Sequence, residues 1–213
     1  AFAAGSSRIF TVYGSDIYAA AAVMGTAMGL IRTRMDSSFA LCYQEVPGML
    51  PTALTESEIA SFHAVQANVY VVRGATNHLL EKGTVASGHR FDEVFSLDRI
   101  SADLQEAALS LMISGTGKLP QTDETSAVFI NRFSAVLAGY AAAGILATGI
   151  WRGNEVGNLQ PGDVIENGYL LWAESYDSQS DSDRAAHKAM PIHAAICLSG
   201  SVETLLIDID VSL

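Results

Sequence analysis

Two long helix-like stretches in the middle of the chain constrain its fold more than any other feature. Residues 92–114 and residues 123–143 each carry apolar side chains at intervals near 3.6 residues, which is typical of helices that bury one face. Gly115, Gly117 and Pro120 lie between them, and both residue types end helices. The sequence therefore predicts two long helices, packed antiparallel or on one face of a sheet. The side chains expected to point inward are Val94, Phe95, Ile100, Leu104, Leu111 and Met112 in the first helix, and Val128, Phe129, Phe133, Val136 and Leu137 in the second.

Short segments rich in β-branched and aromatic residues surround these helices and predict strands. They are residues 39–43, 69–72, 169–172, 192–198 and 203–213. Thr55 and Glu58 have the spacing of a capping box, so we expect a helix from there to about residue 66, directly before a strand. A helix of small residues is expected over 17–30, and a hairpin turn at Lys82-Gly83.

These elements together predict an α/β (α+β) fold, with a mixed β-sheet packed by long helices in a two-layer core. The length of 213 residues fits one domain over residues 1–213. Residues 175–183 are polar, and we expect them to form a solvated loop.

Composition excludes several classes of protein. Hydrophobic residues make up 49% of the chain and charged residues 16%, which excludes intrinsic disorder. Acidic residues outnumber basic ones 23 to 12, giving a net charge of −11, which argues against direct nucleic-acid binding because phosphate contacts need clustered Lys and Arg. No apolar run is long enough for a transmembrane helix, so membrane insertion is not expected. The opening Ala-Phe-Ala has no Met and no basic segment, so no signal peptide is expected.

The motifs that carry chemistry are weak in this chain. Gly115 to Lys118 resemble part of a phosphate-binding loop, but Leu119 occupies the position of the magnesium-binding hydroxyl, so a turn that ends a helix is favoured. Cys42 and Cys197 match no metal-ligand spacing and are interpreted as free thiols, with one distant disulfide left open. No two histidines have the His-x-His or His-Glu-x-x-His spacing of metal ligands, and no Gly-x-Ser-x-Gly motif is present. The sequence predicts no catalytic, cofactor-binding or metal-binding residue.

Two pairs of acidic residues, Asp92-Glu93 and Asp123-Glu124, stand where the long helices begin. Carboxylates there are stabilised by the helix dipole, so a structural role is favoured.

The end of the chain has the alternation of a strand with one apolar and one polar face. The apolar face is formed by Leu205, Ile207, Ile209, Val211 and Leu213. Two interpretations remain open. Asp208 and Asp210 could protect an exposed strand edge from unwanted pairing, or the strand could pair with another subunit through backbone hydrogen bonds.

Several segments, taken in order, resemble one family. They are residues 5–10, 18–29, 44–48, 68–71, 91–94, 118–123 and 183–202. The last of them contains Asp183-Arg184, then Pro191, then two strands joined by a turn at Gly200. In this order and spacing the chain resembles the C-terminal portion of phage contractile-tail (myovirus-type) sheath proteins, in a branch of phage and prophage proteins. That family's proteins are longer, so the resemblance implies an N-terminal region outside this chain.

The resemblance implies a structural virion protein that works without a cofactor. Sheath subunits form hexameric rings stacked helically around a tail tube, and their contraction drives the tube through the host envelope for genome ejection. The implied partners are copies of itself, the tail tube protein, and the baseplate and tail terminator proteins. The implied location is the virion tail, assembled in the host cytoplasm.

The resemblance also implies roles for particular residues. Residues 164–213 would form a module that exchanges strands between subunits, with Leu205, Ile207, Ile209, Val211 and Leu213 at the subunit interface. Separately, Arg184 and Lys188 are expected to face the tube or a neighbouring subunit, because cations are scarce in this chain and these two lie four residues apart on a possible helical turn. Two alternatives remain: another tail component (tube or baseplate), or an α/β enzyme with a site near Trp151 to Asp163.

Overall fold

The structure is a computed structural model that describes residues 8–14, 16–33, 38–114, 117–203 and 205. The chain divides into two compact units, the first formed by residues 1–33, 39–94 and 200–213, and the second by residues 34–38 and 95–199. Helices and strands are mixed, which confirms the α/β class, and the described strands form three small sheets. The single domain over 1–213 and the module over 164–213 stay predictions.

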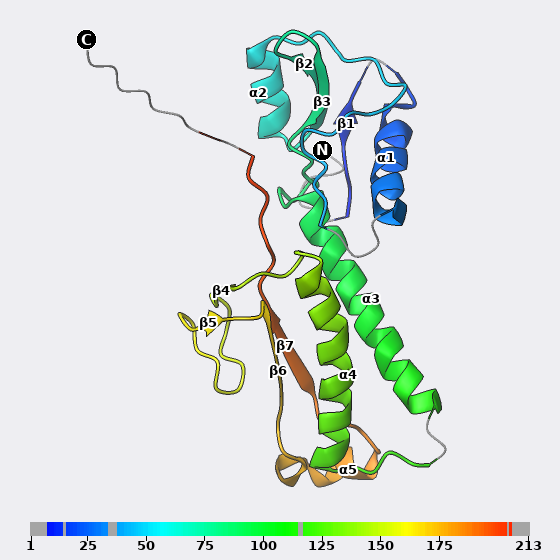
Figure 1. Cartoon of the computed structure of the whole chain (residues 1–213), viewed down its shortest axis with the longest axis vertical. Helices are drawn as coiled ribbons and strands as arrows, with labels where there is room; N and C mark the ends of the chain where they lie inside the picture. Colours follow the sequence, from blue (N-terminus) through cyan, green and yellow to red (C-terminus); the bar gives the residue numbers. More distant parts are fainter. Residues whose placement is uncertain (1–7, 15, 34–37, 115–116, 204, 206–213) are drawn as a thin grey trace, which may run out of the picture. The chain divides into compact units, whose positions relative to one another are not determined.

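The first unit is built on a three-stranded sheet in the order β1 (Val12–Tyr13), β2 (Asn68–Arg73) and β3 (Asn77–Glu81). β1 runs parallel to β2, and β3 runs antiparallel to it. This unit also contains α1 (Ala19–Thr33) and α2 (Glu56–Ala64), and α2 packs against β2 (Figure 1). The helices predicted over 17–30 and after Thr55 are therefore confirmed.

The core of the first unit follows from the spacing of small residues in α1. Ala19, Val23 and Ala27 recur every four residues and are buried against Leu41 and Leu80. The start of α1 lies close to the end of β1, because a Cβ built on Gly14 would come within 2.8 Å of the Ala19 Cβ.

The capping box of α2 has the expected geometry. Thr55 accepts a hydrogen bond from the Glu58 amide, and the Glu58 carboxylate accepts one from the Thr55 amide at 2.8 Å. These bonds satisfy amides that the first turn of a helix leaves without a partner.

Two predictions in this unit are wrong. Residues 39–43 form a turn instead of a strand; Leu41 and Cys42 are buried in it, whereas Tyr43 is exposed and has a φ of 65°. The Tyr43 amide donates to the Leu80 carbonyl at 2.8 Å, and the Leu80 amide donates to the Gln44 carbonyl at 2.9 Å. The end of the apolar run therefore lies along the outer edge of β3, and the burial of Leu41 and Cys42 accounts for its strand-like composition.

The turn of the β2–β3 hairpin lies at Gly74 to Thr76 and not at Lys82-Gly83. Gly74 has a φ of 64°, a conformation that glycine adopts without strain. Gly83 also has a positive φ, but it lies after β3, where an added Cβ would come within 3.0 Å of the Cys42 amide nitrogen. It therefore ends a strand and does not connect two strands.

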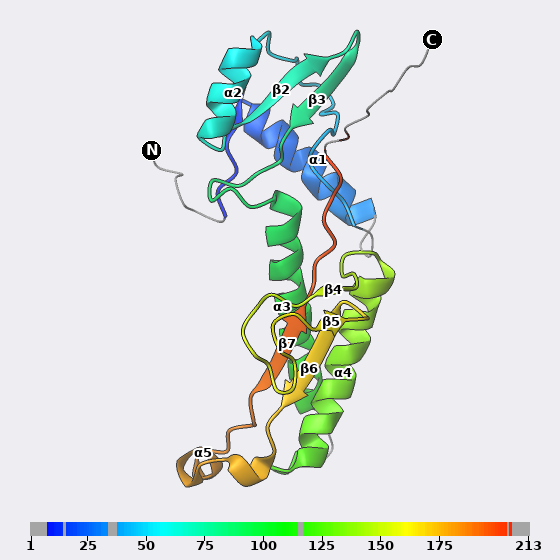
Figure 2. The same ribbon diagram turned by 90° about the vertical axis from the view of Figure 1, so that its left-hand side faces the viewer.

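The second unit contains the two long helices and a hairpin. α3 (Phe91–Ser114) contributes residues 95–114, and α4 (Asp123–Ala142) follows it, as predicted. β6 (Tyr169–Ala173) and β7 (Ile192–Ile196) form an antiparallel pair with α4 alongside β6 (Figure 2). A second small pair, β4 (Gly149–Ile150) and β5 (Val164–Ile165), belongs to the same unit.

The buried faces of the long helices match the prediction in part. Ile100 and Leu137 are buried as expected, but Met112 is 58% exposed and Val128 is 45% exposed. Each of these two residues lies beside the buried stripe of its helix, one position from the half-buried Leu111 in one case and from the half-buried Phe129 in the other. One position is a rotation of about 100°, which is enough to turn a side chain outward.

The segment 175–183 is not a simple loop. It contains a 3-10 turn, η1 (Tyr176–Ser178), and the start of a short helix, α5 (Asp181–Ala185), and Tyr176 is buried. The Asp123 carboxylate accepts hydrogen bonds from the Ser175 hydroxyl and the Tyr176 amide, which fixes this segment at the start of α4.

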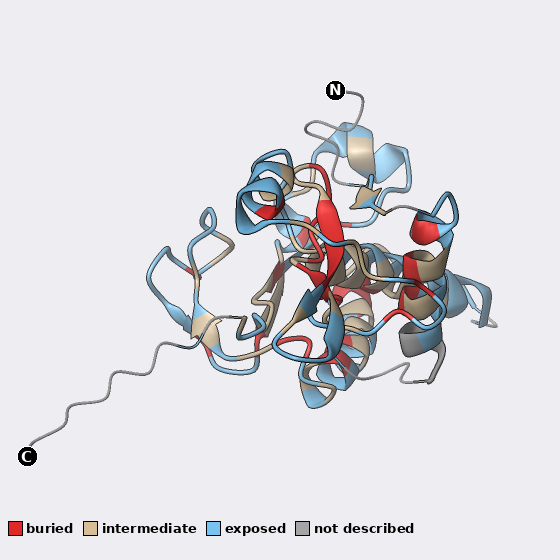
Figure 3. Cartoon of the chain, turned by 90° about the horizontal axis from the view of Figure 1, so that it is seen from above, coloured by how far each residue is buried: buried red, intermediate tan, exposed pale blue. Residues whose placement is uncertain are grey.

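Within the described residues, no helix has the length and apolarity needed to cross a membrane. Figure 3 shows the buried residues as short stretches on helices, strands and loops, separated by intermediate and exposed ones.

Candidate assembly site

The β6–β7 hairpin has two outer edges at which backbone groups point away from the pair. The Cys197 amide donates to the Gly168 carbonyl at 2.8 Å, which fixes the alternation of the ladder. Backbone groups of alternate residues then face outward. They belong to Tyr169, Leu171 and Ala173 on β6, and to Ile192, Ala194 and Ile196 on β7. Among the described residues, no backbone group is bonded to these outward-facing ones.

Both faces of the same hairpin are covered by apolar side chains. On one face, Tyr169 and Leu171 pack against the cluster that contains Leu137. On the other, Leu170 and Ala195 pack with the cluster that contains Leu159. A two-stranded sheet is only marginally stable by itself, so these layers stabilise it. Within the described residues neither edge carries a further strand, and exposed residues occur on β7 but not on β6.

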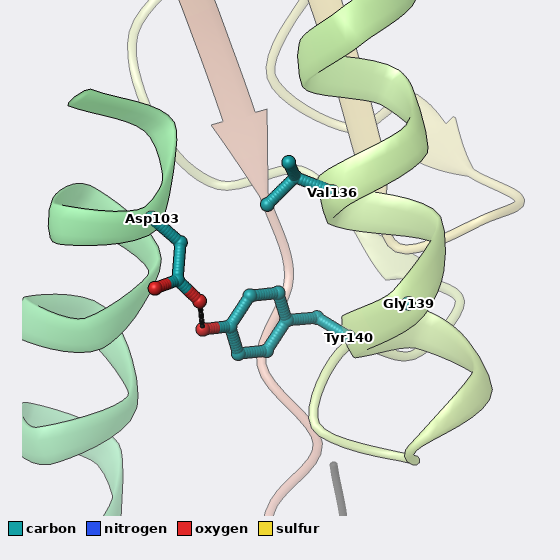
Figure 4. A pocket seen from close by; sticks show the side chains of 4 residues that line it. All are labelled: Asp103, Val136, Gly139 and Tyr140. Carbon is teal, nitrogen blue, oxygen red and sulfur yellow. Dashed lines mark hydrogen bonds between the residues drawn. The ribbon is translucent and has the colours of Figure 1, made fainter. Parts of the chain in front are cut away.

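A small hollow of about 120 Å³ lies between α3 and α4 (Figure 4). The Tyr140 hydroxyl donates to the Asp103 carboxylate there, and the Arg99 guanidinium lies 5.9 Å from the centre of the Tyr140 ring. Burial raises the pKa of Tyr140, and the hydrogen bond to Asp103 raises it further. The tyrosine therefore stays protonated and holds the two helices together.

In the region considered for an enzyme site, two polar side chains are bonded locally. The Trp151 indole donates to the Asn154 carbonyl at 2.7 Å, and the Asp163 carboxylate accepts from the Gln160 amide at 2.7 Å. Cys42 and Cys197 are both free. In the described part of the chain, no group of three or more His, Cys, Asp or Glu residues could hold a metal ion.

The two cations singled out in the sequence lie close together in the second unit, and both have partners. Arg184 donates to the Tyr176 carbonyl at 2.7 Å, and the Lys188 ammonium lies 2.5 Å from the Asp183 carboxylate. The Lys188 side chain is 65% exposed, so it remains accessible to another molecule.

The predicted C-terminal strand is mostly outside the described residues. Ile207, Ile209, Val211 and Leu213 are not described, and Leu205 is 77% exposed. Its pairing with a neighbour stays a prediction.

Sequence reasoning missed the residues that hold the start of this segment. Glu203 forms an ion pair with Arg90, and its carbonyl accepts a hydrogen bond from the Tyr43 hydroxyl at 2.7 Å. All three residues belong to the first unit. Because they are far apart in the sequence and each type is common on surfaces, no local motif indicates the contact.

Comparison with known proteins identifies the family. Residues 91–211 match the family model described as the E217 tail sheath protein gp31-like, C-terminal domain. The chain belongs to this tail sheath family. The family is a structural one, and the resemblance drawn from the sequence is confirmed. No curated protein sequence matches the chain.

Solved structures of contractile assemblies share the fold of this tail sheath domain. A chain of the anti-feeding prophage (AFP) baseplate aligns with a TM-score of 0.74 at 14% identity, covering 99% of this chain and 56% of that one. A chain of the AFP helical sheath in the contracted state gives 0.67 at 13% identity, with 97% and 56% covered. A chain of the contracted PVC sheath complex, an extracellular contractile injection system, gives 0.59 at 13% identity, with 85% and 47% covered. The chain therefore spans about half the length of these structural relatives.

Proposed function

We propose that this chain is the C-terminal part of a contractile sheath subunit, which polymerises around a tail tube and contracts without catalysing a reaction. The observation that carries the proposal is the match of residues 91–211 to a tail sheath domain. Two structural relatives, chains of a helical sheath and of a sheath complex in contracted states, support it.

The assembly we propose consists of hexameric rings stacked helically, with a tail tube inside and baseplate and terminator proteins at the ends. Its location would be the virion tail, after assembly in the host cytoplasm. Residues 164–213 would act as the module that links neighbouring subunits.

The link itself would be a strand added to the β6–β7 hairpin. Residues 205–213 have the period-two pattern of a strand, and the hairpin has open edges between two apolar layers. Backbone hydrogen bonds would supply the affinity, and the apolar face of the added strand would determine its register against the hairpin.

Deleting residues 205–213 from the sheath subunit, expressed with its tube protein, tests the link. The deletion should leave a folded, soluble monomer that forms no sleeves in electron micrographs. Replacing the segment by Gly and Ser residues of the same number should give the same result.

A control separates the two roles considered for Asp208 and Asp210. If these residues only protect an edge, the double change Asp208→Asn and Asp210→Asn causes aggregation, while the deletion variant still forms normal sleeves. Normal sleeves from the deletion variant would reject the strand link.

A position in the baseplate is the second candidate for this subunit, because one structural relative is a chain of a baseplate. Labelling the subunit in intact particles separates the two positions: a sheath subunit is distributed along the tail, whereas a baseplate subunit is confined to its end.

The second part of the proposal is that Arg184 and Lys188 contact the tube or a neighbouring subunit. These cations are accessible in a chain with only 12 basic residues. Tube attachment after a change of charge at this position is the measurement that tests it.

A further inference from the structure

The segment that precedes the proposed exchange strand is held at one point of the first unit. Gly200, Ser201 and Val202 are exposed, and Val202 is 88% exposed. Glu203 is different, because its side chain is only 19% exposed and pairs with Arg90. Leu205, two positions later, is exposed again. The contact is therefore local to Glu203.

Two bonds of different kinds converge on Glu203. Its carboxylate is bound by Arg90, and its carbonyl oxygen by the Tyr43 hydroxyl at 2.7 Å. A side-chain bond alone fixes a position, whereas a second bond to the backbone also restricts the direction in which the chain continues.

Both partners of Glu203 are themselves fixed. Arg90 donates from its other nitrogen to the Lys82 carbonyl at 2.5 Å, and its backbone forms a bridge with Thr84. The Tyr43 amide is bonded to the Leu80 carbonyl of β3. Burial raises the pKa of Tyr43, with the carboxylate of Glu203 adding to the effect, so the hydroxyl remains a donor.

We infer that Arg90 and Tyr43 are positioning residues for subunit linkage: they hold Glu203 so that residues 205–213 leave their own subunit from one fixed point. We call these three residues the Glu203 anchor. The inference rests on the proposed strand link. A segment ordered before it binds loses less conformational entropy on pairing, so the Glu203 anchor should speed assembly.

Tyr43→Phe removes the hydroxyl bond to the Glu203 carbonyl, and Glu203→Gln removes the ion pair with Arg90, each with little change in volume. The two variants are made alone and together. Tyr18→Phe is the matched control, because Tyr18 is an exposed tyrosine of the same unit. NMR order parameters of the backbone amides of residues 202–205 should fall in the double variant of the monomer, and stay unchanged in α4. Sleeve formation, followed by light scattering, should slow by about three- to tenfold, while the control behaves as the parent protein.

The outcomes separate the Glu203 anchor from the strand link. If deletion of residues 205–213 abolishes assembly but the anchor variants assemble like the parent protein and keep its order parameters, the strand link stands and the anchor is rejected. Faster assembly of the anchor variants would also reject the anchor, because the contact would then slow sleeve formation. If the deletion variant assembles normally, both are rejected.

Discussion

Asp92 lies in the first turn of α3, where the helix dipole normally stabilises a carboxylate. Its burial has the larger effect: desolvation raises the pKa of Asp92 to about 6, and the nearby carboxylates of Glu93 and Glu203 add to the rise. The sequence placed Asp92 at a helix start correctly. It did not reveal the burial, and one of the carboxylates that act on Asp92, that of Glu203, lies far along the chain.

The raised pKa predicts a pH-dependent effect of Asp92→Asn. A carboxyl group that titrates at about 6 when folded, and near 3.9 when unfolded, binds its proton more tightly in the folded state. This contribution is complete below about pH 4 and is lost as the pH rises through 6. Asp92→Asn should therefore raise the free energy of unfolding by about 1–2 kcal/mol at pH 8, after allowance for partial exposure, and have little effect at pH 4.

Urea unfolding of the two proteins at pH 4 and pH 8 measures the difference. Glu93→Gln, in the same helical turn, is the control for the loss of a negative charge. An equal effect of Asp92→Asn at both pH values would contradict burial as the cause.

At the scale of elements, the sequence predicted structure well where periodicity and capping agree. α3 and α4 have long helical periods, and α2 has a capping box, and all three were predicted close to their observed bounds. The strand prediction for residues 39–43 failed, because burial in a turn selects the same apolar side chains as a central strand. Only the contacts with β3, which lies far along the chain, decide between the two.

Whether the outer edge of β7 accepts the added strand can be tested by a change in this strand alone. The Ala194 amide points away from β6, so Ala194→Pro removes an outward donor without removing a bond of the hairpin. Monomer stability should fall by no more than about 1 kcal/mol, whereas the rate of sleeve formation should fall by at least about tenfold if this edge accepts the strand.

Ala194→Val keeps the amide and is the matched control. Circular dichroism confirms that each variant is folded, and electron microscopy counts sleeves. Full assembly of a folded Ala194→Pro protein would exclude the edge of β7 as the acceptor.

For the molecule as a whole, the net charge of −11 makes each accessible cation a candidate contact. Lys188→Glu should reduce attachment of the subunit to the tube or to its neighbour by about tenfold, a typical cost for a reversed charge at an interface. The monomer should remain folded, because an exposed ion pair contributes little to stability.

Lys118→Glu, at another exposed lysine of the second unit, is the control, and co-sedimentation with tubes is the measurement. Unchanged attachment, also after reversal of charge at both Arg184 and Lys188, would reject this contact. Because Arg184 also bonds the Tyr176 carbonyl, the double variant needs a check of its fold.

The order of motifs along the chain was enough to indicate the sheath family, because each motif is a short contiguous segment that can be read from the sequence. The Glu203 anchor could not be predicted in this way. Its bonds join residues 160 and 113 positions apart, and only the folded chain brings them together.

The open edges of the β6–β7 hairpin carry a risk for the organism that makes this protein. Main-chain amides and carbonyls are the same in every polypeptide, so an unoccupied acceptor does not distinguish a sister subunit from any unfolded chain nearby. Correct assembly must then depend on timing: the C-terminal strand of a neighbouring subunit has to bind before a segment of an unrelated chain does.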